Sequence, residues 1–402
     1  MPGRLAPTSR SLVLLGGLLL LGSLAASGCD SDFDSPSELK TLRILGIRAT
    51  PAEARPGEIV TVDALVYRPD VGSPAWAEAA DAQPAVPVGY EWRACFLETR
   101  LRGATSSGGQ LGGDFAADSS CFDLAQVLTP EELIAELTAG GAAGGQGELP
   151  DLGSTALDLG RQPTASFPLF PLPPFAGPAS FCPGLTEEER VEQGGRELWI
   201  AGMLLMISLR VTLETASGRQ EVIGNHRLPF RPAADQIGPE QQGQPFRTPR
   251  LCQDPGSAAS LCARNAPPPL PQLRAPNGEW SGEGPIRLAP GQKVKLQPSF
   301  PDEAELPQYV AMSSCGQQLA SAELEQDGGE FVRVESRFLA WYADGGKVSR
   351  NNTILGEEIG TLESAWEAPE DPEGDGRYSL VIVARDGRGG IDWLTLPLLV
   401  VP

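Results

Sequence analysis

Histidine is almost absent from this chain, since His226 is the only one among 402 residues. Zinc sites built on two or three histidines are therefore excluded, and a Ser-His-Asp or Cys-His catalytic arrangement would depend on this one side chain. Neither a G-x-S-x-G nucleophile turn nor a Gly-Lys-Ser/Thr phosphate loop accompanies it. We therefore predict a protein that is not an enzyme and needs no cofactor, and we expect His226 to be a surface residue of a strand or loop.

Positive charge is also scarce. The 31 lysines and arginines are outnumbered by 52 aspartates and glutamates, which gives a formal net charge of −21 at pH 7. Because such a chain repels phosphate backbones, we expect no nucleic-acid partner. Beyond the first thirty residues, long apolar runs are missing as well. The run LWIAGMLLMI at 198–207 is far shorter than the roughly 20 residues of a membrane-spanning helix, so it predicts one or two buried strands.

The N-terminal segment has the features of an export leader. Arg4 and Arg10 precede an apolar stretch from Leu12 to Ala26, and no acidic residue interrupts them. A positive start followed by a short apolar core is typical of a secretory signal. The stretch is too short for a permanent membrane span, which needs about 20 residues.

The end of this stretch reads Ala26-Ser27-Gly28-Cys29. It resembles the lipobox of bacterial lipoproteins, although Ala26 stands where leucine is usual. The resemblance implies cleavage before Cys29 and acylation of its thiol with palmitate-like chains, which would attach the protein to a membrane. Residues 1–28 are thus a predicted lipoprotein signal peptide, and 29–40 a predicted acidic tether.

Six further cysteines follow in what is predicted to be an exported chain, and an even number there favours disulfide bonds. Cys252 and Cys262 form the most direct pair, because the loop between them, QDPGSAASL, is short and rich in turn residues. The other disulfide candidates, whose pairing stays open, are Cys95, Cys121, Cys182 and Cys315. A metal site is disfavoured because no C-x-x-C pair is present.

The two halves of the chain repeat the same order of strand signals. Arg55–Val62 reads RPGEIVTV and Ala289–Leu296 reads APGQKVKL. Each is a Pro-Gly turn followed by alternating apolar residues, which predicts a half-buried strand. Further along, each half has a strand with a tryptophan inside it, Trp92 in the first half and Trp341 in the second.

A predicted hairpin closes each half, at 208–230 and at 378–401, and the second begins YSLVIVARDGRGG. Together with the opening strands and the tryptophans, these hairpins resemble immunoglobulin-like sandwiches, most closely the PKD and bacterial Ig-like types. The resemblance implies a mainly β fold with two immunoglobulin-like β-sandwich domains. The pattern G-R-G-G-x-D-W at 387–393 also resembles uncharacterised lipoproteins common in myxobacteria, which implies a fold and an envelope location but no reaction.

These signals predict how the chain is divided. The first Ig-like domain spans 41–230 and carries a long, loop-rich insertion at 97–197. A linker rich in proline and glutamine spans 231–276, and the second Ig-like domain spans 277–402. Composition of this kind is typical of a semi-rigid connection between domains.

Two short helices are predicted inside the insertion. Thr129 with Glu132, and Thr186 with Glu189, have the spacing of a capping box. The second helix is expected to stop at Gly194. The stretch SFPLFPLPPF at 166–175 could dock a partner in a polyproline-like conformation, but we favour the interpretation that it covers an edge of the sandwich, because large exposed apolar patches are rare.

Few other residues suggest a ligand. The weak calcium candidates in acidic loops are Asp371, Asp375 and Asp386; none has the full ligand spacing of a calcium loop, so we predict no metal. The tryptophans in or beside predicted loops are Trp76, Trp280 and Trp366. They could stack on sugar rings, but packing at sandwich edges is the favoured interpretation.

We therefore expect a lipid-anchored cell-envelope lipoprotein that acts as a binding, adhesion or structural module, with an envelope protein or polysaccharide as partner. The alternative is a cell-wall or carbohydrate-associated hydrolase, or its accessory protein, that uses the insertion in the first domain. Asp30 resembles the inner-membrane retention signal of enteric bacteria, whereas the resemblance to the myxobacterial proteins favours the outer membrane. We expect the outer membrane.

Overall fold

The computed structural model describes residues 37–70, 74–76, 87–96, 120–133, 135, 155–169, 185–216, 218–232, 246–253, 256, 261–274, 284–301, 306–312, 330–355 and 362–401. Strands dominate these residues, so the predicted mainly β fold is confirmed. The strands form several sheets, as in Ig-like sandwich domains. Residues Ser37–Pro402 make up one compact unit.

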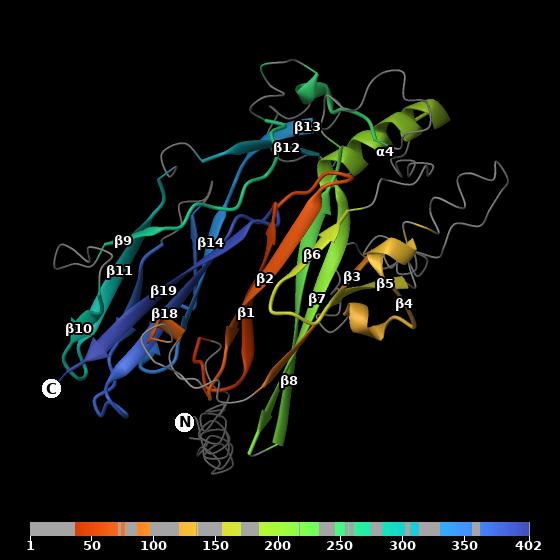
Figure 1. Cartoon of the computed structure of the whole chain (residues 1–402). Helices are drawn as coiled ribbons and strands as arrows, with labels where there is room; N and C mark the ends of the chain where they lie inside the picture. Colours follow the sequence, from red (N-terminus) through yellow and green to blue (C-terminus); the bar gives the residue numbers. More distant parts are fainter. Residues whose placement is uncertain are drawn as a thin grey trace, which may run out of the picture. The chain divides into compact units, whose positions relative to one another are not determined.

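The first half of the chain builds two sheets (Figure 1). Their strands are β1 Arg43–Thr50, β2 Ile59–Tyr67, β3 Val88–Phe96, β4 Gln126–Leu128, β5 Thr155–Gly160, β6 Ala165–Pro168, β7 Met203–Thr215 and β8 Gly218–Phe230. One sheet has the order β1-β2-β6, and the other has the order β4-β5-β3-β7-β8. Buried side chains of both sheets, among them Val62 and Trp92, belong to one apolar cluster. The two sheets therefore pack face to face.

The second half repeats this arrangement. Its strands are β9 Gln272–Arg274, β10 Ile286–Leu288, β11 Lys293–Ser299, β12 Gln308–Met312, β13 Glu330–Val334, β14 Arg337–Ala343, β15 Lys347–Val348, β16 Asn352–Leu355, β17 Ser364–Glu367, β18 Arg377–Arg385 and β19 Ile391–Val400. The sheets β10-β19-β18-β14-β16 and β15-β17-β11-β9 enclose a second apolar cluster that contains Trp341 and Trp366. Strands β12 and β13 pair with each other alone.

The two repeated tryptophans are core residues. Trp92 on β3 and Trp341 on β14 are fully buried. Each indole nitrogen still finds an acceptor: Trp92 Nε1 donates to the Gln162 carbonyl at 2.9 Å, and Trp341 Nε1 donates to Thr353 Oγ1 at 3.0 Å. A buried indole with a satisfied N–H contributes its large apolar area without an unpaired polar atom.

Helix α4 spans Glu187–Ala201 and is longer than predicted. Its start is as expected, because Thr186 and Glu189 form the capping box. It does not stop at Gly194 but runs on to Gly202, whose φ of 70° ends it. Burial of Trp199 on its last turn stabilises the extension, which outweighs the weak helix propensity of glycine. The apolar run at 198–207 is therefore divided between the end of α4 and the start of β7.

The two halves touch through a third apolar cluster. It includes Leu45 on β1 and Val383 on β18. Beside it, the guanidinium of Arg48 lies 2.7 Å from Asp63 on β2 and 2.7 Å from Asp392 on β19. One β1 side chain thus joins carboxylates from both halves.

The segment predicted as a linker is packed in its described parts. Phe246 and Asn265 are buried. Residues Gln272–Arg274 form β9, which pairs with β11. The domain boundaries drawn from the sequence stay a prediction, but these linker residues are part of the folded structure.

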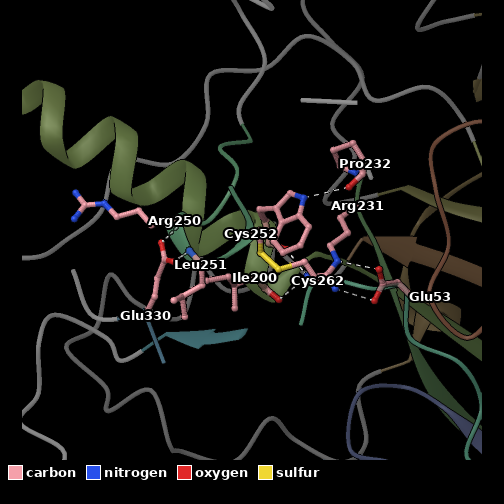
Figure 2. Close-up of a disulfide and its surroundings, with 10 residues drawn as sticks. Glu53, Ile200, Arg231, Pro232, Arg250, Leu251, Cys252, Cys262 and Glu330 are labelled. Carbon is pink, nitrogen blue, oxygen red and sulfur yellow. Dashed lines mark hydrogen bonds and ion pairs between the residues drawn. A yellow bond between two sulfur atoms is a disulfide. The ribbon is translucent and has the colours of Figure 1, made fainter. Parts of the chain in front are cut away.

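Two disulfides lie within the described residues, Cys95–Cys121 and Cys252–Cys262, with Cα–Cα distances of 5.6 and 5.9 Å. The pairing proposed from the short loop is the one observed, and Figure 2 shows this bond against the end of α4. The remaining predicted cysteine positions, Cys29, Cys182 and Cys315, lie outside the described residues.

We expect a Cys252→Ser/Cys262→Ser double variant to lose about 2–3 kcal/mol of unfolding free energy, because the bond closes a loop in the unfolded chain. The second variant for comparison is Cys95→Ser/Cys121→Ser. Its cysteines are 26 residues apart, whereas Cys252 and Cys262 are 10 apart. The longer loop should cost more when it is opened. Urea unfolding measures both losses, and equal stability of the first variant and wild type would contradict the prediction.

Candidate functional site

A pocket of about 630 Å³ lies where elements of both halves meet. Its walls come from the end of α4, the last residues of β8, strands β12 and β13, and the turn between β18 and β19. Five arginines line it: Arg227, Arg231, Arg333, Arg385 and Arg388. We call it the arginine pocket. Among the described residues of its lining, Glu53 is the one carboxylate and His226 the one histidine.

Arg231, which follows β8, is held in place by several acceptors. Its Nε and one terminal nitrogen lie 2.9 and 3.0 Å from the two carboxylate oxygens of Glu53. The other terminal nitrogen donates to the Trp199 carbonyl at 3.0 Å, and the guanidinium lies 4.0 Å from the centre of the Trp199 ring. Figure 2 shows this bidentate pair next to the Cys252–Cys262 disulfide. With its charge paired, Arg231 is a structural wall of the pocket.

Arg388, in the β18–β19 turn, is also paired. Its terminal nitrogens lie 3.5 Å from Glu53 and 3.4 Å from Glu335, and its guanidinium lies 4.8 Å from the Tyr309 ring centre. Glu53 therefore links the last residues of the first half to the turn of the second. The main-chain N–H of Asn265 also donates to Glu53, at 3.3 Å.

The turn that carries Arg388 is shaped by Asp386 and glycine. Asp386 Oδ1 accepts the main-chain N–H of Arg388 at 2.7 Å and of Gly390 at 2.8 Å, while Oδ2 accepts the Asn265 amide at 2.9 Å. Burial raises the pKa of Asp386, and these hydrogen bonds oppose that rise. Gly389 has a φ of 102°, and a Cβ there would lie 2.8 Å from the Pro229 ring, so only glycine fits between the turn and β8.

His226 lies at the pocket wall, and its expected surface position is wrong. The side chain is only 4% exposed, because it is on the core-facing side of β8 along with Leu228 and Phe230. Within the described residues, its Nε2 has no hydrogen-bond partner. Burial, with a smaller effect from the positive charge of Arg385, lowers the pKa of His226 to about 4, so the imidazole is neutral at pH 7.

Arg333 and Arg385 differ from the two paired arginines. Arg385, at the end of β18, donates to the Leu45 carbonyl at 3.1 Å. Arg333 is an exposed residue of β13. In the described part of the chain, no carboxylate forms an ion pair with either side chain. Among the described residues, the pocket thus carries positive charge that no ion pair neutralises.

The calcium candidates are separated by the structure. Asp386 is buried and its oxygens accept the hydrogen bonds described above, whereas Asp371 and Asp375 are exposed in the turn before β18. Asp375 pairs with Arg377, its carboxylate 3.0 Å from Arg377 Nε. Across the described ranges, no group of three or more His, Cys, Asp or Glu side chains is arranged to hold a metal ion. Nor does any helix there have the length and apolar character needed to cross a membrane.

Two of the three tryptophans can be placed. Trp366 is fully buried on β17, which confirms the packing interpretation for it. Trp76 is half-buried in the short 3₁₀ helix η1, Pro74–Trp76, where its Nε1 donates to the Tyr378 carbonyl at 2.9 Å. Trp280 lies outside the described residues, as does part of the stretch at 166–175.

No sequence motif indicates the arginine pocket. Its residues come from positions as distant as 53 and 391, and no local motif joins them. The one signal was the run RDGRGG at 385–390, which contains two of the five arginines, the aspartate of the turn and its glycines. In the sequence this run resembles a family pattern and does not by itself indicate a ligand-binding turn.

No protein-family model and no curated protein matches the chain. Among solved structures it is similar to the D00-D0 domain of intimin, at 8% identity and a TM-score of 0.18, covering 90% of this chain and 99% of that one. It is also similar to a Salmonella alpha-2-macroglobulin, at 11% identity and a TM-score of 0.20, covering 92% of this chain and 17% of that one. Similarity this low supports no conclusion about function.

Proposed function

We propose that this protein is a lipid-anchored module of the bacterial cell envelope that binds a ligand and catalyses no reaction. The observation that carries the binding function is the arginine pocket, a site of small-molecule size between the two halves whose described lining has a single carboxylate. Pockets with an apolar wall and a few convergent polar groups are typical ligand sites.

The described disulfides support the exported location. Stable disulfides form in oxidising compartments, which for a bacterium lie outside the cytoplasm. The apolar leader and Cys29 of the sequence supply the anchor in this proposal. We place the protein at the outer membrane, with an envelope protein or polysaccharide as its larger partner.

The alternative function, a hydrolase or accessory protein built on the insertion at 97–197, gains no support from the pocket. A glycosidase uses two carboxylates that face each other across the substrate. Glu53 is the one carboxylate among the described residues of the pocket lining, and it is already paired with Arg231 and Arg388. The arginine pocket therefore supports the binding function, and it contains no described residue of the insertion at 97–197.

The anchor is tested by intact mass and membrane fractionation of the protein in a bacterial host. We expect the wild type to carry acyl mass and to move with a membrane fraction, and Cys29→Ala to lose both. Ser27→Ala is the matched control, because it keeps a small residue two positions before the cysteine and should still be acylated. A soluble, unacylated wild-type protein would contradict the anchor, and the density of the membrane fraction distinguishes the outer from the inner membrane.

A further inference from the structure

We propose that the arginine pocket binds a small organic oxyanion, a carboxylate or a phosphate, at Arg333 and Arg385 beside His226. This inference deepens the proposed binding function and rests on it. It adds the chemical class of the ligand to that function.

The charge of the pocket is the first argument. The protein has a formal net charge of −21, yet the described lining of this pocket includes five arginines and one carboxylate. Glu53 and Glu335 account for Arg231 and Arg388. Arg333 and Arg385 have no such carboxylate among the described residues, and guanidinium groups of this kind match carboxylate and phosphate oxygens in geometry.

His226 is the second and independent argument. A polar atom that is buried without a partner costs free energy, and native proteins rarely leave one without a reason. Nε2 of His226 is such an atom among the described residues, in a residue that is 4% exposed and lines the pocket. In the tautomer with the proton on Nε2, the neutral ring donates a hydrogen bond, which a ligand oxygen would accept.

The remaining walls limit the ligand's size and character. Apolar side chains such as Leu204, Val310 and Ile391 line the pocket together with the arginines. Its volume of about 630 Å³ is within the range of small-molecule sites. An organic anion would place its charged end at the arginines and its carbon skeleton against the apolar wall.

The test is calorimetric titration of the purified full chain, in a nonionic detergent, with succinate and with inorganic phosphate at constant ionic strength. We expect saturable binding of at least one, and the stronger of the two identifies the ligand as carboxylate or phosphate. The resonances of the single histidine report directly on the pocket, so the bound anion should also shift the His226 imidazole signals in an NMR spectrum.

Arg385→Gln and Arg333→Gln each should weaken binding by about tenfold or more, the loss expected for one hydrogen bond to a charged group. Arg333 is the safer variant because it is exposed, whereas Arg385 also donates to the Leu45 carbonyl. Arg350→Gln is the matched control, since it removes the same charge from an exposed position outside the pocket.

Absence of saturable binding by both anions, or an equal loss in Arg350→Gln, would overturn the inference. These outcomes leave the anchor untouched, because acylation of Cys29 is measured separately. Conversely, a failed anchor would not change the titration.

Discussion

Replacing Glu53 with glutamine is expected to lower the unfolding free energy by about 3–5 kcal/mol, the usual cost of breaking a buried ion pair from one side. Glu53 lies after β1 and is buried. It binds Arg231 through both oxygens and also neutralises Arg388. Glutamine carries no charge, so the guanidinium groups of Arg231 and Arg388 would lose the negative charge of Glu53 in a poorly solvated site. Chemical unfolding at pH 7 measures the loss.

Two variants make this prediction specific. Glu221→Gln changes the same group on the exposed part of β8, where Glu221 pairs with Arg219, and should lose under about 1 kcal/mol. A Glu53→Met/Arg231→Met double variant removes both charges, and it should recover a large part of the loss because apolar replacements of buried pairs are often tolerated. If Glu53→Gln and Glu221→Gln are equally stable, the buried ion pairs of Glu53 do not stabilise the folded protein more than an exposed pair does.

The second large effect is a loss of stability in mild acid that depends on His226. The side chain has a pKa of about 4 in the folded protein and about 6.5 in the unfolded chain. Between these values the unfolded chain binds the proton and the folded protein does not, so unfolding becomes more favourable as the pH falls. Above about pH 6.5, protonation of His226 does not reduce the unfolding free energy. By pH 4 it has lowered the unfolding free energy by about 3 kcal/mol.

His226→Gln isolates this effect, because the chain has no other histidine. The quantity to compare is the unfolding free energy of the variant minus that of the wild type. Between pH 7 and pH 4 this difference should shift by about 3 kcal/mol in favour of the variant. Other groups, including Asp386, titrate in both proteins and largely cancel in the difference. A difference that does not vary with pH, or an NMR titration of His226 near 6.5, would refute the burial argument.

Local sequence signals predicted much of the fold. The Pro-Gly turns and alternating apolar residues located β2 and β11, because a half-buried strand needs a side-chain period of two. The capping box placed the start of α4, since Thr186 and Glu189 satisfy main-chain N–H groups only three residues apart. The short loop between Cys252 and Cys262 identified a disulfide because the two ends of the loop are close along the chain.

Interactions between distant residues account for the errors. The sequence placed the end of α4 at Gly194, but the burial of Trp199 against the core extends the helix. It placed His226 at the surface, but this position belongs to the core-facing side of β8 and to the pocket wall. The end of α4 and the burial of His226 both depend on which distant residues pack against them. A local sequence pattern contains no information about such contacts.

By itself, the sequence determined the mainly β fold, the repeated strands with their core tryptophans, one disulfide, and the absence of histidine-rich chemistry. Each follows from residue types or from neighbours a few positions apart. Only the tertiary structure decided that Glu53, His226, Arg333 and Arg385 share one pocket. The free energy that brings them together comes from the packing of two sheet systems against each other, so the charge of the site is a property of the assembled fold and not of any segment.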